Sequence, residues 1–331
     1  MNKNRKVMFG VGVIIAFCTL AYPSAGQWHA LETIGQATPR HESGLVIFSG
    51  NLYLIGGRGV KPVEVLDLET NEWTQKQPTP IEMHHITPVV VGDKIYVVGG
   101  LTGGYPKEQP IGQVYVYDPV TDQWNTIFEI PKERQRGAGG VVVDGDNIYL
   151  VNGITYGHTS GTNAMMDVYH VSSNTWESLP DVPHIRDHST AAIVNHKLYA
   201  LGGRNTSHHE EGNFMAFFQA VVTEVDVYDL KSGQWSTLST ELPIPSAGAG
   251  IAAWKKGLIY VGGETGDNPA RNEAYYLDAR KESWEALPKL NQGRHGTNAA
   301  IVDDKLYIGA GSGNRGGGPE LNSVEVLGLK K

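Results

Sequence analysis

A hydrophobic segment that ends in glycine is written six times along the chain. The copies are NLYLIGG ending at Gly57, KIYVVGG at Gly100, NIYLVNG at Gly153, KLYALGG at Gly203, LIYVGG at Gly263 and KLYIGAG at Gly311. Their ends lie 43 to 60 residues apart. Repetition at this spacing is typical of architectures in which each unit buries its apolar faces only by stacking on its neighbours. The chain is therefore one repetitive fold and not a series of separate domains.

Each unit has the pattern of a small β-sheet. A run of small or β-branched residues precedes the repeated segment, and alternating residues such as VEVLDL at 63–68 or VDVYD at 225–229 follow it. Alternation of apolar and polar residues between glycines indicates strands. A tryptophan follows six positions after the third strand in five units, at Trp73, Trp124, Trp176, Trp235 and Trp284. The sixth unit lacks it, and an unmatched Trp28 begins the repetitive region, so we expect the first residues to supply the missing strand.

These features resemble the kelch repeat, which pairs glycines after a hydrophobic strand with a tyrosine before them and a spaced tryptophan after them. The resemblance covers residues 28–331 and implies an all-β, six-bladed kelch β-propeller over residues 27–331, closed by the N-terminal strand. The 41 glycines among 331 residues fit a chain of short strands and tight turns. The repeated glycine, tyrosine and tryptophan residues are expected to build blades rather than to act on a ligand.

Residues 1–26 have the pattern of a secretory signal peptide. Lys3, Arg5 and Lys6 precede the apolar run 7–21, and small residues follow at 24–26. The alternative is a retained membrane anchor, but the apolar run is shorter than the ~20 residues that a bilayer requires. We expect cleavage after residue 25 or 26, export to the periplasm or the external medium, and no membrane span in the mature chain.

Charge and cysteine content narrow the classes of partner. The formal net charge is -8 and the isoelectric point about 5.8, so the sequence offers no basic field for nucleic acid. The only cysteine, Cys18, leaves with the leader, which excludes disulfides and thiolate chemistry in the mature protein. An oxidase resembling galactose oxidase, which needs a cysteine-linked tyrosine, is excluded by the same observation. We expect a monomer without a cofactor.

Function is expected where the units differ. The connections between second and third strands vary most in length, and in a propeller they share one face with the loops that lead into the innermost strands. Arginine or histidine residues recur in those loops or follow a glycine pair, so we predict that they surround the channel and bind an anionic sugar, an acidic glycan or an acidic protein segment. The predicted ligand-binding residues are Arg40, His41, His84, His85, Arg136, Arg186, His188, Arg204, Arg294 and His295, with Arg58 as an addition. The alternative is structural: these arginines pair with nearby acids or with blade carbonyls.

The longest insertion, residues 205–223, contains two features. Its HHEE segment at 208–211 carries metal-binding residue types, but no spacing fixes a coordination geometry, so we predict a solvated loop and no metal site. The apolar segment 214–218 would cover the channel mouth or contact a partner protein, unless it packs on its own neighbours. A scaffold for another exported protein is a third possible function.

Glu264 directly follows a glycine pair, and Arg271 lies seven residues later. They are similar to the glutamate and arginine of periplasmic kelch mutarotases that interconvert sialic acid anomers, where a base acts beside an anion-binding group. This resemblance implies catalytic roles for Glu264 and Arg271 in a sugar-acid mutarotase or epimerase, the alternative to a binding module. Plant specifier proteins of the kelch group use an acidic and histidine iron motif, which Glu177, Asp181 and His184 approach with the wrong final spacing.

Overall fold

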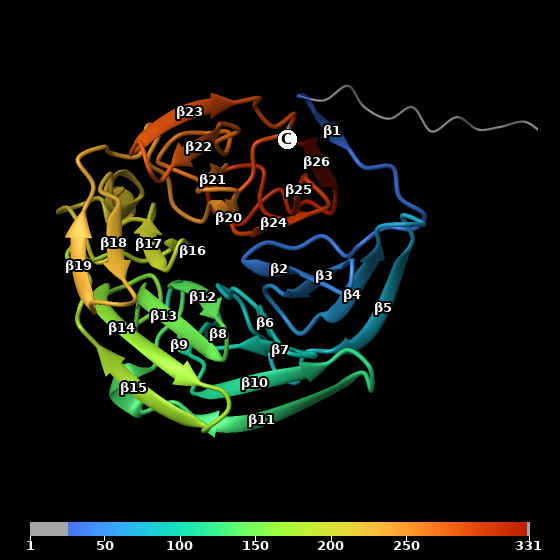
Figure 1. The fold of residues 1–331 in the computed structure, drawn as a ribbon, viewed down its shortest axis with the longest axis horizontal. Helices are drawn as coiled ribbons and strands as arrows, with labels where there is room; N and C mark the ends of the chain where they lie inside the picture. The colour runs from blue at the N-terminus through green and yellow to red at the C-terminus, as the bar shows by residue number, and fades with distance from the viewer. Residues whose placement is uncertain (1–25, 330–331) are drawn as a thin grey trace, which may run out of the picture.

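The computed structural model describes residues 26–329, which form six four-stranded antiparallel sheets arranged as blades around a central axis (Figure 1). Helix is confined here to two short 3-10 turns, η1 (Lys132–Arg134) and η2 (Phe214–Gln219). None of the helices in this part of the chain has the length and hydropathy needed to cross a bilayer. The predicted all-β, six-bladed kelch-type propeller is confirmed.

The first three blades run outward from the axis in chain order. Blade 1 consists of β2 (Ser43–Phe48), β3 (Asn51–Gly56), β4 (Pro62–Asp67) and β5 (Trp73–Pro78). Blade 2 consists of β6 (Val89–Val91), β7 (Lys94–Val97), β10 (Gln113–Asp118) and β11 (Gln123–Glu129), with a small ribbon of β8 (Leu101–Thr102) and β9 (Gln109–Pro110) in its long loop. Blade 3 consists of β12 (Gly140–Asp144), β13 (Asn147–Gly153), β14 (Asn163–His170) and β15 (Thr175–Leu179).

The last three blades repeat this order. Blade 4 consists of β16 (Thr190–Val194), β17 (Lys197–Leu201), β18 (Asp226–Asp229) and β19 (Gln234–Thr237). Blade 5 consists of β20 (Gly250–Trp254), β21 (Gly257–Val261), β22 (Ala274–Asp278) and β23 (Ser283–Leu287). Blade 6 takes three strands from the end of the chain, β24 (Ala299–Val302), β25 (Lys305–Gly309) and β26 (Val324–Gly328).

The fourth strand of blade 6 comes from the other end of the repetitive region. Strand β1 (Trp28–Ala30) pairs antiparallel with β26, and Trp28 lies opposite Leu327. The indole Nε1 of Trp28 donates a hydrogen bond to the Pro288 carbonyl at 2.8 Å, which also ties the strand to blade 5. The predicted closure of the ring by its own beginning is confirmed, and Figure 1 shows β1 at the outer edge of this blade.

The hydrophobic core is divided among the interfaces between blades. Between blades 1 and 2, for example, Tyr53 and Ile55 pack with Ile95 and Tyr117, while Leu45 on the other face of blade 1 packs with residues of blade 6. Equivalent clusters fill the remaining interfaces. A single blade would leave both faces exposed to water, so the stability of each blade depends on its neighbours.

The glycine pairs allow these blades to approach closely at the axial end of the second strand. In blade 4, Gly202 and Gly203 have φ of 65° and 86°, values that favour glycine. A Cβ atom at Gly203 would lie 2.5 Å from the Asp187 carbonyl oxygen, and one at Gly202 would lie 2.3 Å from the Tyr260 hydroxyl. The repeated glycines therefore serve the architecture, as expected.

Candidate functional site

The loops between second and third strands meet the loops that lead into the innermost strands. Backbone bridges join His84 to Leu101, Asp187 to Arg204, Ala247 to Glu264 and His295 to Ser312. In each case a residue before a first strand meets the residue that directly follows the last glycine of the repeated segment. Side chains from both kinds of loop are thereby brought to one end of the axis. This arrangement places the variable segments beside the predicted Arg and His positions.

A closed circle of backbone hydrogen bonds surrounds the axis at this end. One residue per blade takes part: Glu42, His85, Ala138, His188, Gly248 and Gly296, each with a positive φ between 50° and 64°. The N–H of His85 donates to the Glu42 carbonyl at 2.8 Å, and four similar bonds lead round to the N–H of Ser43, which donates to the Gly296 carbonyl at 3.2 Å. An axial cavity of about 40 Å³ lies within the circle. Non-glycine residues at positive φ store local strain, which makes the Glu42, His85 and His188 side chains candidates for function.

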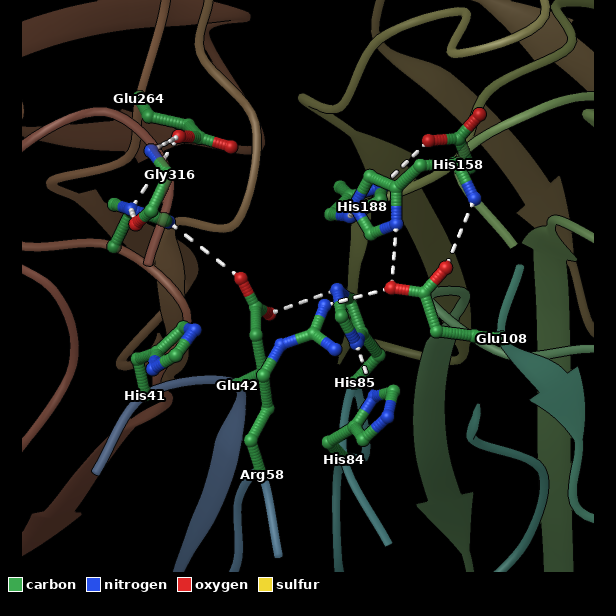
Figure 2. A network of polar contacts seen from close by, with 12 residues as sticks. His41, Glu42, Arg58, His84, His85, Glu108, His158, His188, Glu264 and Gly316 are labelled. Carbon is green, nitrogen blue, oxygen red and sulfur yellow. Dashed lines mark hydrogen bonds and ion pairs between the residues drawn. The ribbon is translucent and has the colours of Figure 1, made fainter. Parts of the chain in front are cut away.

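Twelve polar side chains gather at this end of the axis, and we call them the axial polar cluster. They comprise four carboxylates, two guanidinium groups and six imidazoles: Glu42, Glu108, Asp187, Glu264, Arg58, Arg204, His41, His84, His85, His158, His188 and His295. Figure 2 shows Glu42 between a histidine-rich group and a second group around Glu264. Carboxylates outnumber guanidinium groups in this cluster, whereas the sequence suggested a rim of arginines and histidines.

Three histidines of this cluster converge from different blades. One ring nitrogen from each of His85, His158 and His188 lies within 4.8 Å of the others, and all three residues are buried. The Nε2 atoms of His158 and His188 are 3.2 Å apart. These three are the set that can hold a metal ion among the residues of the described chain.

Neighbouring groups fix the orientation of these rings. His158 Nδ1 lies 2.9 Å from Glu108 Oε1, and His188 Nδ1 lies 2.6 Å from Asp187 Oδ1. His85 Nδ1 lies 2.6 Å from His84 Nδ1. Burial opposes ionisation of Asp187, but His188, Arg204 and Thr162 outweigh it and lower the pKa of this carboxyl to about 2.

Burial acts in the opposite direction on the imidazoles, whose charged form it disfavours. Burial, reinforced by Arg58, lowers the pKa of His84 to about 4. Burial and the neighbouring histidines lower the pKa of His85 well below its usual value, and burial with Arg204 lowers the pKa of His188 despite Asp187. His84, His85 and His188 are therefore neutral at physiological pH, the form in which imidazole binds a metal.

The second group of the cluster is centred on Glu264. Its carboxylate pairs with Arg204, accepts a hydrogen bond from the Gly316 N–H at 2.8 Å and lies 3.3 Å from His295 Nε2. Burial would raise the pKa of Glu264, but His295, Arg204 and Gly316 lower it to about 2. Glu42 links the two groups, because its carboxylate oxygens lie 3.4 Å from His85 Nε2 and 3.7 Å from His295 Nδ1.

Four of the predicted ligand-binding arginines form ion pairs within their own blades. Each is fully buried, and each pairs with an acid on the third strand of its own blade: Arg40 with Glu64, Arg136 with Asp167, Arg186 with Asp226 and Arg294 with Glu325. Arg136 also donates to the carbonyls of Asn152, Leu150, Arg134 and Met165. Blade groups satisfy these guanidiniums, which agrees with the structural alternative that the sequence left open.

The two remaining arginines of the prediction lie within the axial polar cluster. Arg58 is partly exposed and pairs with Glu108 at 2.7 Å. Arg204 is buried, bonds to Glu264 and Thr206, and lies with its guanidinium carbon 5.0 Å and 4.8 Å from the ring centres of Phe217 and Phe218. Arg204 is therefore held within the protein by an ion pair, a hydrogen bond and two aromatic contacts.

The structure directs Glu264 and Arg271 to different places. Glu264 faces the axis and its guanidinium partner is Arg204, whereas Arg271 bonds to Thr265 and Asp267, each at 3.2 Å. A mutarotase site of the kind implied by the resemblance requires both groups to face one sugar acid. The pairing of Glu264 with Arg204 gives that proposal no geometric support.

Arg271 lines a separate cleft between blades 5 and 6. The cleft has a volume of about 470 Å³ and is walled by Arg271, Asp267, Glu273 and several amide side chains, which are Asn268, Asn272, Asn291, Gln292 and Asn314. The Arg271 Nε atom is buried and has no hydrogen-bond partner. This volume lies within the usual range for small-molecule sites, roughly 300–1,000 Å³.

The apolar segment of the longest insertion is split between packing and exposure. It forms η2, in which Phe217 and Phe218 are buried against Arg204 while Phe214 and Met215 are 44% and 42% exposed. The Tyr105 hydroxyl contacts Met215 Sδ at 3.4 Å, and the Tyr105 ring packs on His158. The segment thus covers the histidine group and also presents an apolar edge to solvent.

Sequence reasoning did not find four members of the cluster: Glu42, Glu108, His158 and Asp187. His158 and Glu108 lie in long loops of different blades, and nothing in their spacing to His85 or His188 indicates contact. Asp187 and Glu42 are adjacent to nominated residues. Charged residues recur before the first strand, and this pattern could have indicated both acids, but the prediction considered only Arg and His.

Comparison with known proteins agrees with this architecture. The KLHDC2/KLHL20/DRC7 Kelch-repeats domain matches residues 18–181 and 103–311. The chain is 30% identical to the kelch-like protein terF of Aspergillus terreus over 87% of this chain and 65% of terF, and 25% identical to alpha-scruin of Limulus polyphemus over 77% of this chain and 26% of that protein. It therefore spans just under two thirds of terF and a smaller part of alpha-scruin.

The solved structure of YjhT superposes with a TM-score of 0.72 at 16% identity and covers 89% of this chain and 97% of that one, which shows a shared fold. A shared propeller fold does not by itself assign a function, which has to be argued from the residues of the site. With six repeats that each end in glycine, a ring closed by its first strand and a matching family model over most of its length, the chain belongs to the kelch-repeat family.

Proposed function

We propose that this protein is exported and binds a polar, anionic ligand of the size of a sugar acid in the cleft between blades 5 and 6. The single observation that carries the proposal is Arg271, whose partly buried side chain lines the cleft with an unpartnered Nε atom. A guanidinium with a free N–H suits a carboxylate, because it donates in the plane in which the carboxylate accepts.

The other walls of the cleft suit the hydroxyl groups of a sugar. Side-chain amides offer both donors and acceptors, and five of them line the space together with Asp267 and Glu273. The existing ion pair between Arg271 and Asp267 is exposed, with 68% of the Asp267 side chain accessible, so it costs little to replace. A ligand carboxylate would take the place of Asp267 while the sugar hydroxyls bond to the amides.

Calorimetric titration with N-acetylneuraminate, glucuronate and galacturonate tests this proposal, with glucose and galactose as neutral references. We expect saturable binding of at least one acid, weaker binding at high salt and no binding of the neutral sugars. Arg271→Ala should weaken binding at least tenfold. The matched control is Arg280→Ala, which removes an exposed arginine of the same blade that pairs with Asp278.

Equal binding to wild-type protein and Arg271→Ala would exclude the cleft as the binding site. The isomerase alternative is tested in the same samples by exchange NMR of the sugar anomers. Because Glu264 faces Arg204 and the axis, we expect no acceleration over buffer.

Export is proposed from the leader, whose residues lie outside the described part of the chain. The support is its order of Lys3, Arg5 and Lys6, then the apolar run 7–21, then small residues. N-terminal sequencing of the mature protein should begin at residue 26 or 27 and should find it outside the cytoplasm. Recovery of an uncleaved cytoplasmic chain would contradict this part of the proposal.

An exposed apolar edge supports a protein partner as a second candidate. Tyr105, Phe214 and Met215 are each more than 40% exposed and come from loops of blades 2 and 4 that touch one another. Aromatic residues and methionine are enriched at protein interfaces. Substitution of Phe214 and Met215 by Ser should abolish any stable complex found with the exported proteins of the native host. Ile127→Ser, on the exposed outer strand of blade 2, should not.

A further inference from the structure

The rest of the fold does not explain why the buried rings of His85, His158 and His188 lie so close together. Each ring has one nitrogen occupied by a group on the outside of the trio: Glu108 for His158, Asp187 for His188 and His84 for His85. The second nitrogens of His158 and His188 face each other, with their Nε2 atoms 3.2 Å apart. The His85 ring packs edge-on against both, with its centre 5.3 Å from that of His158 and 4.8 Å from that of His188. Figure 2 shows the His85 ring beside Glu42 and His84, close to the other two.

The positions of the protons follow from the outer partners. An ionised carboxylate only accepts hydrogen bonds, so Nδ1 of His158 and Nδ1 of His188 carry the protons. His84 Nε2 faces the Gly103 carbonyl at 3.1 Å and must donate to it, which leaves His84 Nδ1 as the acceptor for His85 Nδ1–H. With Nδ1 engaged on each ring, Nε2 is the nitrogen of each histidine that remains for another partner.

Two of these Nε2 atoms are in contact, and such a contact needs either a proton or a cation between the nitrogens. His158 Nε2 and His188 Nε2 are 3.2 Å apart, and His85 Nε2 is buried without a hydrogen-bond partner. Two acceptors at this distance repel, and a buried polar atom that lacks a partner carries a desolvation cost of roughly 1–3 kcal/mol. A cation bound to all three nitrogens removes both penalties.

We propose that His85, His158 and His188 bind one divalent transition-metal ion at the mouth of the axis. Imidazole nitrogen suits zinc, copper, iron and nickel. Zinc–nitrogen bonds of about 2.0–2.1 Å in a tetrahedral site place ligand nitrogens about 3.3 Å apart, close to the separation of the His158 and His188 atoms. The residue set and the spacing of the His158 and His188 nitrogens therefore suit the metal, and the His85 nitrogen lies within 4.8 Å of both.

The surroundings are those of a supported metal site. Metal-binding histidines commonly donate their second N–H to a carboxylate, which fixes the tautomer and raises the basicity of the ligand. Glu108 and Asp187 are in that position for two of the three ligands, and both carboxylates are buried. Glu42 Oε2 lies 3.4 Å from His85 Nε2 but is not part of the group of three, so the three imidazoles are the ligands that the protein supplies.

Titration of the chelator-treated wild-type protein with Co²⁺ tests the proposal directly. We expect one Co²⁺ per chain, a visible absorption band typical of four- or five-coordinate cobalt, and its displacement by one equivalent of Zn²⁺. Elemental analysis of protein purified without chelator should find a transition metal at a comparable stoichiometry. Neither measurement depends on the sugar-acid ligand, so failure here would not affect the proposed function.

Variants then locate the ion. His158→Ala and the volume-conserving His158→Gln should each weaken Co²⁺ binding at least 100-fold. Glu108→Gln, which leaves all three ligands in place but removes the carboxylate that supports His158, should weaken it 10- to 100-fold. The matched control is the double variant His208→Ala/His209→Ala, which removes two histidines from the exposed loop of blade 4 and should bind as wild type does.

Two results would overturn the proposal. One is the absence of saturable Co²⁺ binding by the wild-type protein, which would mean that a proton and not a metal relieves the contact between His158 and His188. The other is loss of binding in the His208/His209 variant with retention in both His158 variants, which would move the ion to the exposed loop. Far-UV circular dichroism shows in each case that the variant has kept the propeller fold.

Discussion

The blade arginines and the axial histidines were predicted as one rim, and the structure separates them into two kinds of buried group. Arg40, Arg136, Arg186 and Arg294 each lie within a single blade, where an acid and several carbonyls accept their N–H groups. The axial histidines instead meet across blades, and His85 Nε2 and His295 Nδ1 have no hydrogen-bond partner. Both groups are buried. They differ because the blade satisfies the hydrogen bonds of the arginines, whereas some nitrogens of the histidines have no partner.

This difference indicates which residues of a repetitive fold are candidates for function. A buried charge that its own blade satisfies contributes to the architecture, and removing one partner leaves the other uncompensated. A buried polar atom that its surroundings leave unsatisfied implies an additional partner. The axial end is also where blades cease to be equivalent, because one position holds Glu42, His85, Ala138, His188, Gly248 and Gly296 in turn.

The chain itself contains a control for the structural role of the arginines. Blades 2 and 5 lack the ion pair: Met83 stands where the other blades have arginine and packs in the same cluster as Tyr115, which stands where they have the acid. Blade 5 has Ser246 and Tyr275 at these positions. Both members of the pair are therefore replaced together, as expected if neither charge can remain alone.

The largest expected effect follows from breaking one such pair. Arg186→Met leaves Asp226 buried with an uncompensated charge and should lower the free energy of unfolding by about 3–5 kcal/mol. Guanidinium chloride unfolding monitored by tryptophan fluorescence measures the change. The double variant Arg186→Met/Asp226→Tyr copies the pair of blade 2 and should recover most of the loss. A double variant no more stable than the single one would show that the buried charge is not the cause.

A smaller effect on stability is expected from Glu264, one of the carboxylates of the axial polar cluster. The pKa of Glu264 falls from an ordinary 4.5 to about 2 in the folded protein, so the carboxylate stabilises the fold fully above pH 4.5 and loses this contribution as the pH falls toward 2. The shift corresponds to about 3 kcal/mol. Glu264→Gln should be less stable than wild type at pH 7, and the gap should narrow as the pH falls from 4.5 to 2.5. A pH-independent gap would refute the assignment.

Metal binding should change the free energy of unfolding by a similar amount. This change should depend on the axial histidines and not on the blade arginines. At a free Co²⁺ concentration of 100 times the dissociation constant, a single site in the folded state adds about 2.7 kcal/mol to the free energy of unfolding. Wild-type protein and Arg186→Met should both gain it, while His158→Ala should gain nothing. Thermal unfolding at fixed metal concentration measures the three responses. A gain in His158→Ala equal to that of wild type would place the ion elsewhere.

The repeats predicted the architecture because packing between blades depends on a pattern that each unit carries. The spacing of Trp73 and its equivalents, and the unmatched Trp28, were sufficient to predict four strands per blade and the closure with β26. The axial site was predicted only in part. His84, His85, His188 and Glu264 were nominated because they stand beside repeated positions, but His158 and Glu108 reach the axis through loops whose paths no repeat determines.

The arginines were assigned to the rim because the pattern shows where a residue stands and not which way its side chain turns. Arg136 lies two positions before the residue that faces the axis, and its guanidinium turns back into blade 3 to reach Asp167 and the Leu150 carbonyl. The acids that accept these arginines occur on third strands, at Glu64, Asp167, Asp226 and Glu325. These acids and the arginines occur in the same four units, so a comparison of the two patterns would have predicted the ion pairs.

The smallest expected effect on stability separates binding from architecture most cleanly. Arg271 is partly exposed, its ion pair with Asp267 is at the surface, and neither contributes to a blade interface. Arg271→Ala should therefore change the free energy of unfolding by no more than about 0.5 kcal/mol, in contrast to the buried Arg186. If the same variant loses binding of a sugar acid, the guanidinium acts on the ligand and not on the fold. Denaturant unfolding and calorimetry on one preparation decide this, because a destabilisation comparable to that of Arg186→Met would return Arg271 to the structural class.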